Sequence, residues 1–270
     1  MNPIISTAAL GDRLADPNLV VIDCRFQLAD PQWGRTQYQQ SHLPGAYYLD
    51  LNTDLSAPVA SHGGRHPLPD PTVLGEKLAA MGIIWGKTAV VAYDDAHCAF
   101  AARLWWLLRY YGHGAVMVLD GGWPAWVAEQ RPVTAATPES RSGYFVPQVQ
   151  PDWCMEREQV RRGQDSGTLT LVDARDADRY RGDREPIDPI AGHIPGAVNR
   201  PWREATTAAG YWRSPSEQRQ RWDGIDWEGT VAVYCGSGVT ACVNLLSLAI
   251  ADLPSAQLYP GGWSDWCSFL

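Results

Sequence analysis

A chain of 270 residues, with 45% hydrophobic and 19% charged residues, has the composition of a folded protein with room for two domains. No apolar run reaches the ~20 residues that a membrane-spanning helix needs, and a net charge of -8 disfavours a nucleic-acid binder, which needs a basic face. The N-terminal sequence has no basic segment followed by an apolar stretch. We therefore predict a cytoplasmic protein that binds neither membranes nor nucleic acids.

An internal repeat is the most informative feature of the chain. LVVIDCRF, SHLPGAYYLD, AVVAYDDAHC and LDGGWPAWV in the first half correspond to LTLVDARD, GHIPGAVNRPW, VAVYCGSGVTAC and YPGGWSDWC in the second. Paired landmarks recur in the same order, namely Asp23 and Asp173, His42 and His193, Asp94 and Cys235, and Gly121 and Gly261. The repeat predicts two related domains, residues 1–135 and 152–270, joined by a linker rich in Pro, Ser and Thr within residues 131–153.

In chain order, each half alternates short β-rich apolar runs with helical patterns, which predicts an α/β fold with a parallel sheet flanked by helices. The runs TAVVAYD (88–94) and TVAVYC (230–235) are apolar nearly throughout, as strands covered on both faces are. Residues 97–112 are apolar on more than one face and end at a glycine, which indicates a buried helix with a glycine C-cap. A second helix is predicted from about Thr240 to Asp252.

The segment after the second of these strands carries the candidate nucleophile. Cys235 ends the strand, and Gly236, Ser237, Gly238, Val239 and Thr240 follow before the helical pattern begins. Ligands of parallel α/β sheets bind at this edge, glycines let loop N–H groups converge on one point, and a helix N-terminus favours a thiolate. We predict that Cys235 is an accessible nucleophile and that the loop amides hold its persulfide anion. The alternative is a buried apolar thiol.

The other cysteines show no comparable loop. Cys242 lies among apolar helix residues and is predicted to be core, and Cys24, Cys98, Cys154 and Cys267 are taken as packing residues or bystanders. No CxxC pair occurs, and no His has zinc-ligand spacing from a cysteine, so we expect neither a metal site nor a disulfide framework. No organic cofactor is predicted.

The loop CGSGVTAC, the HLPGA and HIPGA segments, the VDARD strand end and the two GGW segments resemble the two-domain thiosulfate/3-mercaptopyruvate sulfurtransferases over nearly the whole chain. The resemblance implies tandem rhodanese-like domains that move a sulfane sulfur from a small donor, through a Cys235 persulfide, to cyanide or to a thiol such as thioredoxin or glutathione. The first domain has Asp94 at the cysteine position, and a carboxylate cannot carry a sulfane sulfur. That domain is therefore expected to be catalytically silent.

The resemblance also separates donor classes. Thiosulfate-specific members carry basic residues directly after the cysteine, whereas Gly236 and Ser237 stand there in this chain, as in the mercaptopyruvate-type members. We therefore expect 3-mercaptopyruvate to be a better donor than thiosulfate.

Three arginines are implied as substrate-binding candidates. Arg179 matches the family arginine that binds the charged end of the substrate, and its alternative is an ordinary surface arginine. The position of a second family arginine is occupied by Asp188, and Arg184 is the candidate to reach the same region. Arg175 either lines the pocket or braces the loop.

Ser237 and His66 match two members of a Ser-His-Asp relay that some family members use. Simple alignment puts Asn52 at the acid position, between Asp50 and Asp54, so a complete relay is not implied. His66, with its neighbour Arg65, is alternatively a residue that only closes the site. His42 and His193 occur in both halves and are therefore interpreted as structural.

Two other functions compete with sulfur transfer. A cysteine phosphatase needs an arginine six positions after the cysteine to grip phosphate, and that position is Ala241. A sulfur carrier or sensor would accept sulfur at Cys235 without turnover, and the intact loop argues for an enzyme instead.

Overall fold

The computed structural model describes residues 2–270, which form two compact units. Unit 1 contains the residues up to Ala57, Pro69–Gln150 and Ala208–Trp212, and unit 2 contains Pro58–Leu68, Pro151–Thr207 and Arg213–Leu270. Each half of the chain therefore gives a short segment to the unit built mainly by the other half. Within the described residues, no helix is long and apolar enough to cross a membrane.

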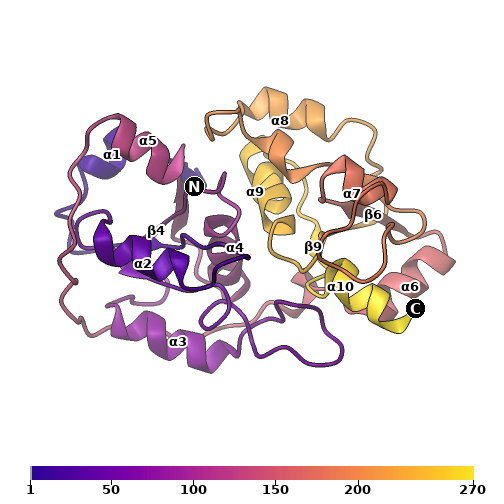
Figure 1. Ribbon diagram of the computed structural model, residues 1–270, viewed down its shortest axis with the longest axis horizontal. Coiled ribbons are helices and arrows are strands. Elements are labelled where there is room, and N and C mark those ends of the chain that lie inside the picture. The colour runs from indigo at the N-terminus through magenta and orange to yellow at the C-terminus, as the bar shows by residue number, and fades with distance from the viewer. Residues whose placement is uncertain (1) are drawn as a thin grey trace. The chain divides into compact units, whose positions relative to one another are not determined.

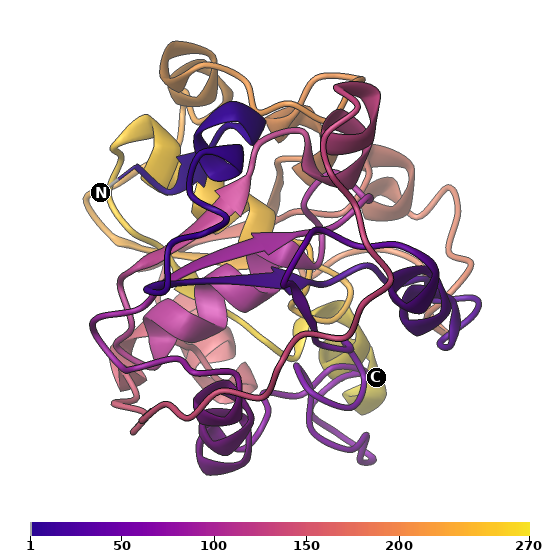
Figure 2. The ribbon, with the colours of Figure 1, turned by 90° about the vertical axis from the view of Figure 1, so that its left-hand side faces the viewer.

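Unit 1 is built around a five-stranded parallel sheet with the strand order β1-β5-β4-β2-β3. Figure 2 shows these strands in the middle of the unit with helices on either side. Its elements are β1 (Ile4–Ile5), α1 (Thr7–Gly11), β2 (Leu19–Asp23), α2 (Trp33–Gln40), β3 (Tyr47–Tyr48), α3 (Pro71–Ala80), β4 (Ala89–Tyr93), α4 (Ala101–Tyr110), β5 (Val116–Leu119) and α5 (Gly122–Ala128).

Unit 2 repeats this plan with a four-stranded parallel sheet in the order β7-β6-β8-β9. In Figure 1, α8 and α9 lie side by side next to this sheet, and α6 and α10 lie on its other side. Its elements are η1 (Pro151–Trp153), α6 (Arg157–Asp165), β6 (Leu169–Asp173), α7 (Ala177–Arg181), β7 (Val198–Asn199), η2 (Trp202–Ala205), α8 (Pro215–Arg221), β8 (Thr230–Tyr234), α9 (Ala241–Ala251), β9 (Gln257–Leu258), α10 (Gly262–Trp266) and η3 (Cys267–Phe269).

The central strands of both sheets are buried on both faces, which explains their continuous apolar sequences. In β4 and β8 only the first residue is not buried. Alternate side chains of each strand point to opposite faces of the sheet and pack in separate core clusters. In unit 2, Leu171, Ala232 and Tyr234 pack with Val160 of α6 and Trp263 of α10. The predicted α/β fold with a parallel sheet in each half is confirmed.

The helix predicted over residues 97–112 begins later than expected. His97 and Cys98 have φ values of 56° and 64°, and the chain becomes helical only at Ala101, where α4 starts. A left-handed backbone cannot continue a right-handed helix, so these residues form a loop instead. The helix does end as predicted, because Gly112 has a φ of 77° and its N–H donates to Arg109.

The helix predicted from about Thr240 to Asp252 is confirmed within one residue at each end. Helix α9 spans Ala241–Ala251, with Thr240 as its N-cap and Asp252 as its C-cap. Nearly all of it is buried, including Cys242. The structure thus confirms Cys242 as a core thiol.

Candidate active site

The loop between β8 and α9 is held by close backbone contacts that need glycine. Gly238 has a φ of 72°, and a Cβ there would lie 2.4 Å from the carbonyl oxygen of Pro260. Gly262, with a φ of 60°, would place a Cβ 2.5 Å from the carbonyl oxygen of Cys235. The same carbonyl accepts the Trp263 N–H at 2.8 Å. The GGW segment therefore fixes the start of the cysteine loop.

The GGW segment of unit 1 fixes the corresponding loop in the same way. A Cβ on Gly122 would lie 2.3 Å from the carbonyl oxygen of Asp94, and that oxygen accepts the Trp123 N–H at 2.8 Å. This packing explains why the GGW segments recur beside Asp94 and Cys235.

The Asp94 loop shows what this backbone binds. The Asp94 carboxylate accepts four backbone N–H groups, from Ala96, Cys98, Phe100 and Ala101, at 2.8 to 3.0 Å. Burial raises the pKa of Asp94, and these four hydrogen bonds oppose the rise. The loop of unit 1 is therefore an anion cradle that its own side chain fills.

Cys235 is more deeply placed than the sequence predicted. The sequence indicated an accessible sulfur, but only 2% of the residue is exposed. Within unit 2, the guanidinium groups of Arg65 and Arg179 lie over the neighbouring Gly236, and Ser237 is bonded to His66. These side chains cover the loop, so a donor has to reach the sulfur past them.

The structure brings together Ser237 and His66, the two residues that match members of a Ser-His-Asp relay. His66 Nδ1 and the Ser237 hydroxyl are 2.7 Å apart, and both residues are buried. His66 comes from the segment 58–68, which other contacts hold on unit 2. The Gly63 N–H donates to Asp265 at 2.7 Å, and the Arg65 N–H donates to the Ser264 hydroxyl at 3.1 Å.

The acids near the Asn52 position have structural partners in unit 1. Asp50 accepts the N–H groups of Asn52 and Thr53 at 2.8 and 3.1 Å, and Asp54 pairs with Lys77. These bonds hold a turn, so both carboxylates have a role that does not involve a relay.

Arg65 is the residue of this site that the sequence did not single out for binding. A Cβ on Gly236 would lie 2.8 Å from Arg65 Nη2 and 3.6 Å from Arg179 Nη2, so both guanidinium groups border the residue that follows Cys235. Burial lowers the pKa of Arg65, and the negative charge of an ionised Cys235 opposes this fall. The sequence clue that could have identified Arg65 is its position between Gly64 and His66. Gly64 has a φ of 83° and packs on the Gly261 carbonyl, which holds this segment beside the cysteine loop.

Two buried acids join the arginines into one network. Arg179 pairs with Glu185 at 2.7 Å and with Asp188 at 3.1 Å, and Arg65 pairs with the other oxygen of Asp188. The acid side chains are 3% and 2% exposed, whereas Arg179 and Arg65 are 12% and 27% exposed. The structure places the guanidinium of Arg179, the candidate for binding the charged end of the substrate, at the cysteine loop with Arg65 beside it.

Arg184 does not join this network, contrary to the sequence-based candidate. Its guanidinium pairs with Asp178 at 2.7 Å, and both side chains are exposed. The side chain extends to the surface because its ion-pair partner lies there, and Arg65 lies where the candidate was expected.

Arg175 is held by contacts at the end of strand β6. It donates to both Asp173 oxygens and to the Gly192 carbonyl, its guanidinium lies over the Trp263 ring, and its side chain is 1% exposed. Arg25 makes the same contacts in unit 1, with Asp23, the Ser41 carbonyl and the Trp123 ring. Because both units share it, the bracing role is favoured over the predicted substrate contact.

The two repeated histidines are structural, as predicted. His42 and His193 each place Nδ1 2.6 or 2.7 Å from a backbone carbonyl, of Tyr38 and Tyr180 respectively. Each ring also stacks on the tyrosine that it contacts.

Fold and site together define a tandem α/β protein in which one strand-end loop begins with a cysteine and its repeat is filled by an aspartate. A family model described as "Rhodanese-like domain" matches this chain twice, over residues 6–129 and 156–269. The chain belongs to the rhodanese family.

Known relatives give the class of reaction. A probable 3-mercaptopyruvate sulfurtransferase of Pseudomonas aeruginosa is 44% identical over 97% of this chain and 94% of its own length. A putative thiosulfate sulfurtransferase, SseB, of Mycobacterium tuberculosis is 37% identical over 98% of this chain and 94% of its own. The crystal structure of the 3-mercaptopyruvate enzyme SseA of Escherichia coli superposes with a TM-score of 0.85, at 29% identity, over 98% of this chain and all of that one. The chain is a sulfurtransferase.

Proposed function

We propose that this enzyme transfers a sulfane sulfur from 3-mercaptopyruvate to a thiol, through a persulfide on Cys235. The observation that carries the proposal is the Asp94 loop, in which four backbone amides point at the side chain of the residue that ends the strand. Cys235 ends the corresponding strand of unit 2. The same backbone would direct its amides at a thiolate or a persulfide anion, each of which carries one negative charge, as the carboxylate does. Unit 1, with Asp94 in this place, is proposed to be silent.

The chemistry balances without a redox cofactor. The Cys235 thiolate attacks the donor sulfur, the carbon–sulfur bond breaks, and its electron pair stays on carbon as the enolate of pyruvate. The proton of the donor thiol ends on that carbon, which gives pyruvate and leaves the persulfide anion on Cys235. An acceptor thiolate then attacks the outer sulfur and regenerates the Cys235 thiolate.

Ser237 and His66 are proposed to move the proton between donor sulfur and carbon. Their 2.7 Å hydrogen bond joins a hydroxyl one residue beyond Gly236 to an imidazole ring nitrogen, a group that can accept and return a proton. The direct contact between the Ser237 hydroxyl and the imidazole, next to Gly236, supports this role over simple closure of the site.

The remaining loop residues are proposed to bind the donor through their backbone. Gly236, Gly238, Val239 and Thr240 carry no charged side chain, which favours a donor whose anionic group lies away from its sulfur. In 3-mercaptopyruvate that group is a carboxylate, and Arg179 and Arg65 border the loop at Gly236. Thiosulfate, which the name of the Mycobacterium relative contains, is the second and weaker donor.

The acceptor is proposed to be thioredoxin, glutathione or another small thiol in the cytoplasm. All six cysteines are free thiols, as is usual in a reducing compartment. Recovery of the native protein in the periplasmic fraction of its cells would contradict this placement.

Donor treatment followed by intact-mass measurement tests the proposal. Exposure to 3-mercaptopyruvate should add one sulfur atom to the peptide that contains Cys235, with release of one pyruvate per sulfur bound. Addition of reduced thioredoxin should then remove that sulfur without further pyruvate release. Pyruvate formation should exceed thiocyanate formation from thiosulfate and cyanide in kcat/KM. Modification of another cysteine, or turnover without a persulfide, would overturn the proposed route.

A further inference from the structure

The charges around the cysteine loop cancel. Arg65 and Arg179 border Gly236, and each of them is paired with Asp188, while Arg179 also pairs with Glu185. Nearby, the Arg175–Asp173 pair adds one charge of each sign. Two guanidinium groups at the loop are therefore matched by two carboxylates, before the charge of the thiolate is counted.

Asp188 is the acid that connects the two arginines. Its Oδ1 pairs with Arg65 and its Oδ2 pairs with Arg179, whereas Glu185 pairs with Arg179 and Arg175. The Asp188 side chain is only 2% exposed, so water screens its charge weakly. The arginine side chains are more exposed than the acid, so an entering anion meets the guanidinium groups with Asp188 behind them.

Asp188 therefore sets how much negative charge the site accepts. A donor with one carboxylate brings a single charge to the two guanidinium groups. Thiosulfate brings two charges to a cluster that has no net positive charge to offset them, so its second charge meets the field of Asp188 at short range.

We propose that Asp188 is a specificity-determining residue, which selects singly charged sulfur donors against doubly charged ones because it completes, with Glu185, the neutralisation of Arg65 and Arg179. This inference rests on the proposed sulfur transfer at Cys235. The donor preference is then due to the charge of Asp188, in the loop that follows α7, as well as to the uncharged residues of the cysteine loop.

The first test replaces Asp188 by Asn, which keeps the shape and removes the charge. The measured quantity is the ratio of kcat/KM for thiosulfate to kcat/KM for 3-mercaptopyruvate. Asp188→Asn should raise this ratio about tenfold, because the cluster gains a net positive charge that acts twice on the dianion. Asp188→Glu, which keeps the charge, should leave the ratio within about twofold of the wild-type value.

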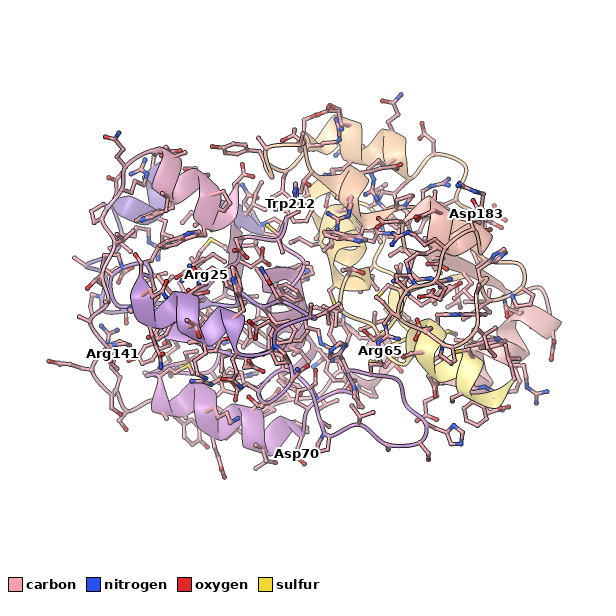
Figure 3. The ribbon with its side chains drawn as sticks, viewed as in Figure 1. Arg25, Arg65, Asp70, Arg141, Asp183 and Trp212 are labelled. Carbon is pink, nitrogen blue, oxygen red and sulfur yellow. The ribbon has the colours of Figure 1, made fainter. Side chains whose placement is uncertain are left out.

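Asp183→Asn is the matched control for net charge. It makes the same change of charge in the same region of the sequence, but Asp183 pairs with Arg181 at the surface, where both side chains are more than half exposed. Figure 3 labels Asp183 and Arg65 at separate places in unit 2. The control should leave the donor ratio unchanged, and an equal rise in both variants would overturn the inference.

A compensating substitution tests the sign. Arg65→Gln removes one positive charge and should lower the ratio, and the double variant Arg65→Gln/Asp188→Asn restores neutrality and should return the ratio toward the wild-type value. The double variant also serves as a control if Asp188→Asn is unstable. A guanidinium that loses its buried partner lowers stability, and the double variant removes both Arg65 and Asp188. A ratio that fell further in the double variant would contradict the charge account.

Ligand binding separates this inference from the proposed function. In Cys235→Ser protein, which cannot turn over, calorimetry with thiosulfate and with pyruvate reports the anion preference alone. Asp188→Asn in this background should tighten thiosulfate about tenfold more than pyruvate. If the wild-type enzyme forms no persulfide while this binding shift occurs, the proposed function fails and the charge selection stands. If the wild type forms the persulfide and neither ratio moves, the selection fails alone.

Discussion

The loops that begin at Asp94 and at Cys235 have the same setting and different contents. Each follows the central strand of a parallel sheet, each leads into a buried helix, and each has its first carbonyl bonded to the N–H of a GGW tryptophan. In unit 1 the cradle is filled by the Asp94 carboxylate. In unit 2 the same position holds a thiol. The two loops thus share their setting, and the chemistry proposed for the second loop depends on the one side chain that replaces the carboxylate.

Two further positions separate the loops. Asp95 in unit 1 corresponds to Gly236 in unit 2, where a side chain would collide with Arg65, and Ala96 corresponds to Ser237, which binds His66. The Asp94 loop is therefore acidic, whereas the Cys235 loop is uncharged, is covered by Arg65 and has the Ser237–His66 hydrogen bond beside its sulfur.

The largest effect is expected from the sulfur itself. Cys235→Ser should lower kcat with 3-mercaptopyruvate by at least about a thousandfold, because a hydroxyl at this place cannot carry the transferred sulfur. Cys242→Ser, in the core of α9, is the matched control and should lower the melting temperature while kcat stays near the wild-type value. Pyruvate release is measured for both variants, and circular dichroism checks that they fold. Activity in Cys235→Ser would disprove the assignment of Cys235 as the nucleophile.

A substitution in the silent loop should change stability and leave the chemistry alone. Asp94→Ala removes the acceptor of four buried amides and should lower the free energy of unfolding by about 3 kcal/mol. Urea denaturation measures the loss, and kcat of the folded variant should be unchanged. A variant as stable as the wild type would show that the amides do not depend on the carboxylate.

The proton-carrying pair offers an intermediate effect. Ser237→Ala should lower kcat about a hundredfold, with a smaller change in KM, because the hydroxyl assists proton transfer. Folding should be intact, since the corresponding loop of unit 1 is built with Ala96. Steady-state kinetics over a range of pH checks the prediction. An unchanged kcat and pH profile would leave Ser237 and His66 with only the closing role.

The smallest effect concerns Asp95. Burial and the neighbouring Asp94 raise its pKa from 3.8 to about 6, against the opposing charge of Arg25. The folded state therefore holds this proton more tightly than the unfolded chain. Below the pKa of the unfolded chain, near 3.8, the Asp95 carboxyl costs no stability. As the pH rises from there to the folded pKa of about 6, its cost to the free energy of unfolding grows. Asp95→Asn should stabilise the protein by about 1–2 kcal/mol near pH 7 and hardly at all near pH 4. Equal gains at both pH values would contradict this.

Much of the fold was predictable because the sequence repeats it. The apolar runs of β4 and β8, helix α9 and the paired histidines follow from local patterns that occur twice. The start of α4 was mispredicted, because the left-handed residues His97 and Cys98 are imposed by amides that turn toward Asp94, and helical periodicity does not report such a contact.

The candidate site was predictable where one motif contained it. Cys235, its glycines and the Ser237–His66 pair follow from the loop and its resemblance to a known family. The network of Arg65, Arg179 and Asp188 was not, since Arg65 lies more than a hundred residues from the other two and the sequence had offered Arg184 instead.

The amino-acid sequence by itself determined two parallel-sheet units and placed one thiol at the end of a central strand, because strand burial, glycine turns and helix ends are written in neighbouring residues. Only the tertiary structure decided that residues 58–68 join unit 2, that Cys235 is covered, and that Asp188 pairs with two arginines. Charge balance and exposure depend on which distant segments meet in space, and that is settled by packing of the whole unit.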